Sequence, residues 1–287
     1  MTALLCQPFV RNAFAAGTVI AITSAIIGYF VVLRAQAFAA HALSHVGFAG
    51  ATLAALTGAD SLAGAAGFTV AAALGMGALG KRIRGRDIEI GMILSLALGL
   101  GVLFLRLYTA SSSEAAGVLF GSIFSITQAN IMFTLILGLG TLTLLAIIFR
   151  PLLFVSIDPE VAEARGVPVK ALSIIFMLLL AITVATAIQI VGVLLVFALI
   201  VAPAAAAQHL SRNPFSAIFI AILLGLAFTW GGLLLALASN YPVSFYIAGL
   251  AAITYFMAMG IGHLMRPRVP GVQRHHDREE RNEQLIG

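Results

Sequence analysis

The sequence predicts an all-α, polytopic membrane protein with about nine transmembrane helices, and three observations lead to this fold class. First, 61% of the 287 residues are hydrophobic and 9% are charged, with a mean hydropathy of +1.07; soluble proteins carry roughly 25% charged residues. Second, the apolar residues form repeated runs close to the roughly 20 residues that a spanning helix needs. Third, the cations gather in alternate links between these runs, as in multi-pass proteins.

The predicted spans follow the apolar runs in order along the chain. They are 10–33, 38–57, 62–80, 88–107, 129–149, 171–187, 190–206, 215–238 and 243–265. The first run is too long for a typical signal-peptide core and is expected to remain as a span. The sixth and seventh runs are short, and only Ile188 and Gln189 separate them, so eight spans is the alternative count.

The cations predict how the spans are oriented. Fourteen of the sixteen Lys and Arg residues fall on one side of a nine-span arrangement, and only Arg11 and Arg106 fall on the other. By the positive-inside rule, this places the N-terminus outside and the C-terminus in the cytoplasm. Eight spans would break the alternation of the charged links, so we prefer nine.

The links between the spans are too short to hold a soluble domain. We expect residues 1–270 to form a single transmembrane domain and 271–287 a charged cytoplasmic tail. One outer link contains an apolar stretch, 118–127, which is too short to span and predicts an interfacial or re-entrant helix. The single cysteine, Cys6, excludes a disulfide framework and a cysteine-based zinc site.

Two histidines inside the second predicted span are the candidate metal ligands. His41 and His45 are four residues apart, so they lie on the same face of a helix, one above the other. Histidine is a common metal ligand, and ionisable residues are rare inside spanning helices. The pair therefore indicates a path for a cation or a proton. The alternative is that both imidazoles only hydrogen-bond neighbouring helices.

A short helix is predicted near residues 158–166, in a link on the cytoplasmic side. Asp158 suits an N-cap, Pro159 the first helical position, and Glu160 the positive end of the helix. Gly166 suits a left-handed residue after the helix, and the proline that follows stops its continuation. The helix is either a docking element for a soluble partner or a plain connection lying on the membrane.

Five segments taken together resemble one family, the permease subunit of bacterial ABC importers for divalent transition metals of the zinc/manganese type. They are LRAQAFAAHALSH from Leu33, DIEIGMILS from Asp87, LFGSIFSIT from Leu119, DPEVAEARGV from Asp158 and VGVLLVFALIVAPAAAA from Val191. No single segment is highly specific, but their order and spacing cover most of the chain, roughly residues 28–242.

The resemblance implies a transport function and several partners. A permease homodimer in the plasma (inner) membrane would bind two cytoplasmic ATPase subunits and receive its metal ion from an extracytoplasmic solute-binding protein. ATP would be bound by the partner alone, since the chain has no Walker sequence, G-x-x-x-x-G-K-[ST]. No permanently bound cofactor, catalytic residue or nucleic acid is expected. The residues of the coupling helix that meets the ATPase would be Asp158, Pro159, Glu160, Glu163, Arg165 and Gly166.

The chain departs from the family pattern in having few carboxylates along the expected path. The family usually has an acidic residue at the position of His41, often has Asp at Ser122, and commonly has Asp before a proline near the outer end of the eighth span, where 239–245 contains no acid. Imidazole ligands suit zinc, copper or nickel better than manganese, which prefers oxygen. We therefore expect zinc first and manganese second.

Three other functions compete with a metal-ion permease. An intramembrane metallopeptidase needs a general base beside the first histidine, but Ala42 stands there. An ion-coupled secondary transporter or channel usually carries ionisable residues in several spans. An ABC permease for a metal chelate or another small cofactor would lack ligand-type residues in its path, so His41 and His45 distinguish it from a carrier of bare ions.

Overall fold

The computed structural model of the chain describes residues 7–78, 87–108, 126–239 and 241–265, and this part contains ten α-helices and no strand. The helices are α2 (Pro8–Leu33), α3 (Ala37–Thr57), α4 (Ser61–Ala78), α5 (Asp87–Leu107), α7 (Gln128–Ile157), α8 (Pro159–Ala164), α9 (Val169–Val191), α10 (Val193–Leu210), α11 (Pro214–Ala238) and α12 (Val243–Met265). The all-α, polytopic class predicted from the sequence is confirmed.

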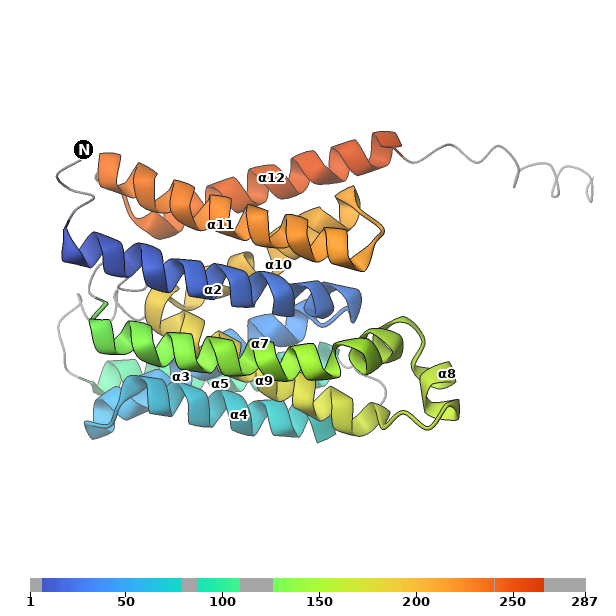
Figure 1. Cartoon of the computed structure of the whole chain (residues 1–287). Helices are drawn as coiled ribbons and strands as arrows, with labels where there is room; N and C mark the ends of the chain where they lie inside the picture. The colour runs from blue at the N-terminus through green and yellow to red at the C-terminus, as the bar shows by residue number, and fades with distance from the viewer. Residues whose placement is uncertain (1–6, 79–86, 109–125, 240, 266–287) are drawn as a thin grey trace, which may run out of the picture.

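Nine of these helices lie side by side as one bundle, and α8 is a separate short helix at one end (Figure 1). Eight described helices are long and apolar enough to cross a membrane. The remaining helix of the bundle, α4, has a shorter apolar stretch, Ser61–Gly77, and packs between α3 and α9. It corresponds to the third predicted span. Helix α2 begins at one end of the bundle and α12 ends at the other, as an odd number of passes requires (Figure 1).

Two predicted boundaries were wrong. The sixth and seventh spans separate at Gly192, not at Ile188 and Gln189, which lie in the last turns of α9. Gly192 has a φ of 83°, a conformation that glycine adopts without steric cost, so the turn falls there. Helix α7 continues to Ile157, past the predicted end at residue 149, although Pro151 lies inside it.

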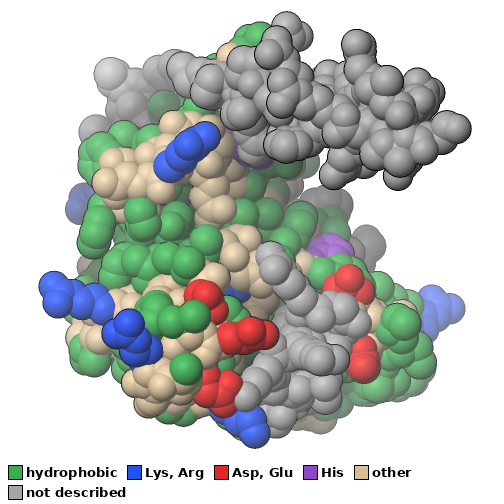
Figure 2. All heavy atoms as spheres, turned by 90° about the vertical axis from the view of Figure 1, so that its right-hand side faces the viewer, with side chains coloured by type: hydrophobic (Ala, Val, Ile, Leu, Met, Phe, Trp, Pro, Cys, Tyr) green, Lys and Arg blue, Asp and Glu red, His purple; other side chains and the backbone are tan. Residues whose placement is uncertain are grey.

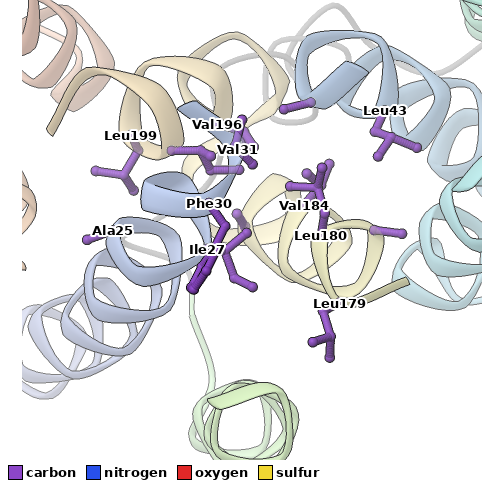
Figure 3. Packing of buried hydrophobic residues seen from close by; sticks show 14 of the residues in the cluster. Ala25, Ile27, Phe30, Val31, Leu43, Leu179, Leu180, Val184, Val196 and Leu199 are labelled. Atoms are coloured by element: carbon purple, nitrogen blue, oxygen red, sulfur yellow. The ribbon is translucent and has the colours of Figure 1, made fainter. Parts of the chain in front are cut away.

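The core of the bundle forms where α2, α3, α9 and α10 meet. In Figure 3, Phe30 of α2, Leu43 of α3, Leu180 of α9 and Val196 of α10 converge, and each of these side chains is fully buried. By contrast, α5 and α12 expose most of their apolar side chains. In a bilayer such side chains contact lipid or another subunit, while the interior is held by close van der Waals packing.

Small residues let α3 and α4 approach each other closely. A Cβ added at Gly50 would collide with the carbonyl oxygen of Gly64 and would lie 2.8 Å from the Cβ of Phe68. A Cβ added at Gly64 would in turn lie 2.5 Å from the Cβ of Ala54. The small-residue face of α3, which allows close helix packing, holds this helix at the centre of the bundle, in contact with α4, α5, α9 and α10.

Several sequence predictions fall outside the described residues. They concern Cys6, the apolar stretch 118–127 apart from its last two residues, Ser122, and the tail 271–287. At the start of α4, the Asp60 carboxylate accepts a hydrogen bond of 2.8 Å from the backbone N–H of Ala63, which is the geometry of an N-cap.

Candidate metal site and docking helix

The two histidines of the second span meet in the structure. Both lie on α3, and their rings pack edge to face with 4.8 Å between centroids and 87° between planes. Each side chain is partly buried. The prediction that His41 and His45 share one helix face is therefore confirmed, and their imidazole rings are in contact.

A side chain of helix α10 packs against this pair. The ring of Phe197 packs against His41 with 5.0 Å between centroids and 69° between planes. On α3 itself, the hydroxyl of Ser44 donates a 2.7 Å hydrogen bond to the backbone carbonyl of His41. The aromatic ring restricts the rotamers that His41 can adopt, which favours a fixed ligand geometry.

The hydrogen bonding of His41 favours the site interpretation over the structural alternative. Its Nδ1 atom is buried and has no hydrogen-bond partner among the described residues. Buried polar groups in folded proteins are nearly always paired, and the exceptions require an explanation. A histidine whose role was to link neighbouring helices would use this nitrogen. Because this nitrogen is buried here, a ligand would reach it only after the imidazole turned.

The pair alone does not complete a metal site. Within the residues that the structure describes, no group of three or more His, Cys, Asp or Glu side chains is placed to hold a metal ion. Zinc in resident sites takes four ligands. Two imidazoles therefore supply at most part of such a coordination shell.

The helix predicted near 158–166 is α8, and its capping is as expected. The Asp158 carboxylate accepts hydrogen bonds from the backbone N–H groups of Glu160 (3.2 Å) and Val161 (3.0 Å). Gly166 has a φ of 81°, and its N–H bonds the carbonyl of Glu163 at 2.9 Å. These bonds satisfy backbone groups at both ends of a helix that is only six residues long.

One side of α8 is anchored and the other is exposed. Ala162 is fully buried against the bundle, where α8 contacts α7 and α9. Glu160, Glu163 and Arg165 are exposed, as is the apolar Val161. A helix with a rigid base and an exposed mixed surface can serve as a contact for another protein.

The end of the bundle that carries α8 is the charged one. Figure 2 shows acidic side chains there in two separate groups, with basic side chains around the rim. Apart from Asp60, the described acidic residues belong to the start of α5 or to the α8 segment: Asp87, Glu89, Asp158, Glu160 and Glu163. The described acidic groups thus stand at helix ends and not in the apolar middle of the bundle.

One residue of interest was missed by the sequence analysis. Arg34 was counted only as a cation of the first link, but its guanidinium donates hydrogen bonds to Ser173 (2.8 Å) and Ser156 (3.4 Å). Its Cζ lies 5.4 Å from the centroid of the Phe176 ring. Burial lowers the pKa of Arg34 to about 10, so the side chain is still charged at neutral pH. No local sequence pattern predicts these contacts.

Comparisons with known proteins agree with this architecture. The manganese transport system membrane protein MntC of Listeria monocytogenes is 30% identical over 256 residues, which cover 89% of this chain and 91% of the relative. The high-affinity zinc uptake system membrane protein ZnuB of Haemophilus influenzae is 28% identical over 224 residues, covering 77% of this chain and 85% of that protein.

A solved structure matches the fold closely. A chain in the structure of PsaBC from Streptococcus pneumoniae in complex with Fab superposes with a TM-score of 0.80 and 29% sequence identity, covering 90% of this chain and 93% of that chain. The family model described as the ABC 3 transport family matches residues 6–262. The chain therefore belongs to the ABC 3 transport family and is a multi-pass permease of the plasma membrane.

Proposed function

We propose that this chain is the permease of an ATP-driven importer for a divalent transition-metal ion, with zinc preferred over manganese. The observation that carries the proposal is the pair His41 and His45 inside an apolar helix. Their ring centroids are 4.8 Å apart, and the buried Nδ1 of His41 has no hydrogen-bond partner among the described residues. Ionisable residues in such a position mark ion pathways. The family membership and the names of the manganese and zinc relatives support the class of cargo.

The order of the metals rests on ligand chemistry. Two imidazoles without a carboxylate suit zinc, whereas manganese prefers oxygen ligands. Several of the most similar relatives, MntC among them, are named for manganese, and ZnuB is named for zinc, so the preference for zinc rests on the ligands and not on these names. A site with two histidines and a partial coordination shell would release zinc more readily than a closed four-ligand site. Transport requires such release.

The same proposal assigns the partners. A cytoplasmic ATPase would bind α8 through Glu160, Glu163 and Arg165, whose side chains are exposed on the charged end of the bundle. That end would be cytoplasmic, since positive charge favours the inner side. The opposite end would receive the metal from a solute-binding protein. A second copy of the chain would complete the permease by covering part of the exposed apolar surface.

An ABC permease for a metal chelate is the competing function. Such a cargo has its own ligands and would not need histidines in the path. The unpaired Nδ1 of His41 favours the bare ion, because a chelate would leave that atom without a partner as well.

Uptake by the reconstituted complex tests the proposal. The chain, its ATPase and its solute-binding protein are placed in liposomes, and ATP-dependent uptake of zinc and of manganese is measured. Replacing both His41 and His45 with Ala should abolish metal uptake without loss of membrane insertion. His263→Ala is the matched control, because that histidine is exposed near the end of α12. Full uptake by the double variant would reject the assignment of the pair.

A further inference from the structure

Arg34 stands where three parts of the bundle meet. It is the residue that ends α2, and its N–H bonds the backbone carbonyl of Phe30. Through its side chain it bonds Ser156 on the last turn of α7 and Ser173 on the second turn of α9. These two helices flank α8 on either side along the chain, so one guanidinium holds both helices from which α8 projects (Figure 1).

The partners of this guanidinium are unusual. A cation removed from water normally pairs with a carboxylate, because desolvation of an unpaired charge is costly. Among the described residues, the hydrogen-bond acceptors of the Arg34 guanidinium are two neutral hydroxyl groups, and the Phe176 ring lies beside it. Such contacts are weaker than a buried ion pair and can be exchanged at a lower cost.

Unpaired polar atoms gather in the same corner. Four buried side-chain atoms have no hydrogen-bond partner among the described residues, and three of them are Nε of Arg34, Oε1 of Gln36 and Nδ1 of His41. Between the first two lies Ala35, whose φ of 54° is in the left-handed region that non-glycine residues rarely adopt. The N–H groups of Ala35 and Gln36 bond the carbonyls of Val32 and Val31, so this backbone is an ordinary helix ending, and it is the side-chain atoms that are incompletely paired here.

We infer that Arg34 is a positioning residue that links movement of α8 to the histidine pair. A displacement of α8 moves Ser156 and Ser173, and their bonds to Arg34 pass the displacement to the α2–α3 corner. Helix α3 begins at Ala37, and His41 lies in its second turn. The inference rests on the proposed function, since it assigns the coupling of ATP hydrolysis to metal release at that same site.

Arg34 is not itself a ligand in this scheme. A guanidinium is a permanent cation with five donors and no acceptor, so it repels a divalent metal ion. Its role is to act through the helices that it bonds. The readout that isolates this role is the number of metal ions carried per ATP hydrolysed, which a purely structural residue does not change as long as the complex folds.

The first experiment removes the acceptors and keeps the charge. In the reconstituted complex, the Ser156→Ala, Ser173→Ala double variant should carry about tenfold fewer ions per ATP, the effect of losing a charge-assisted hydrogen bond. Ser173→Thr in the Ser156→Ala background keeps one hydroxyl and should restore most of the ratio. Thr183→Val is the matched control on α9, because among the described residues that hydroxyl bonds the carbonyl of Leu179 in its own helix.

The second experiment removes the charge. Arg34→Met should also uncouple hydrolysis from uptake, yet it should leave the unfolding temperature of the complex unchanged or raised, since replacing a buried charge by an apolar side chain is often stabilising. A residue needed only for stability would give the reverse, with a lower unfolding temperature and a normal ratio of ions to ATP. That reverse result would overturn the inference.

A third measurement does not depend on transport. Spin labels at Ala164 of α8 and Phe38 of α3, both exposed, are introduced in a Cys6→Ser background, which has no other cysteine. Addition of ATP to the complex should change the distance between the labels, and Arg34→Met should remove that change. An unaltered change in Arg34→Met would reject the link. If the unmodified complex carried neither metal, the proposed metal cargo would be rejected. The label distances would still test whether Arg34 links α8 to α3.

Discussion

Gly50 of α3 and Gly64 of α4 face each other so closely that a Cβ at either position would collide with the backbone carbonyl of the other. This contact fixes the distance between two helices of the bundle. It bears on the candidate site because α3 carries His41 and His45, the first of them about two and a half turns before Gly50. The small residues here set the position of the histidines as well as the stability of the fold.

Adding a methyl group at this contact should destabilise the protein. Gly50→Ala forces α3 and α4 apart, and overpacking of this kind costs about 1–3 kcal/mol. Thermal unfolding in detergent should therefore begin at a lower temperature. Gly67→Ala on α4 is the control, because nothing lies within 4 Å of a Cβ added there. Equal stability of the two variants would show that the close approach is not needed.

The metal preference should change when an oxygen ligand replaces a nitrogen ligand at His41. His41→Asp puts a carboxylate beside His45 and should raise manganese uptake relative to zinc uptake, since manganese prefers oxygen. Competition between the two metals in reconstituted liposomes gives the ratio directly. Equal transport of both metals by the unmodified chain, with no response to His41→Asp, would mean that this pair does not select the ion.

The cap of α8 should matter for ATPase binding. Asp158→Ala leaves the N–H groups of Glu160 and Val161 without their acceptor, at a cost of about 1 kcal/mol, or about fivefold in association. Asp158→Asn keeps an acceptor oxygen and should bind nearly normally. Titration of the purified ATPase against each variant measures the difference. Binding that is equally strong in all three proteins would place the contact elsewhere.

The aromatic contact on His41 should tune metal affinity. Phe197→Leu removes an edge-to-face ring pair, which is worth about 0.5–1.5 kcal/mol, and gives His41 more rotamers. The apparent affinity for zinc should fall by about two- to tenfold, measured as the concentration for half-maximal uptake. Phe219→Leu, at an exposed position on α11, should have no effect. Equal losses in both variants would point to a general effect on the bundle.

Much of this architecture could be predicted from the sequence because its signals are local. Apolar runs with polar breaks place most helix ends within a few residues, and the caps of α8 can be read from Asp158 and Gly166. The extension of α7 could not be predicted in this way. Its last turns continue beyond Pro151 because Leu152 and Val155 are buried in the core, a tertiary effect that outweighs the local preference.

The candidate site also combines contacts that the sequence predicts with contacts that it does not. The spacing of His41 and His45 is a property of one helix, and their contact was expected. The contact with Phe197 depends on how α3 and α10 pack, and the partners of Arg34 are 122 and 139 positions away in the chain. No periodicity in a single sequence connects such distant residues, so only the folded structure reveals them.

Gly192 has a consequence for how the protein is made. Only this residue separates α9 from α10, so no polar link long enough to stay in water lies between the two helices. A helix that enters the bilayer alone would leave the backbone groups of the turn unsatisfied in hydrocarbon. We therefore expect the two segments to enter the membrane together as a hairpin, with α9 held until α10 has been synthesised.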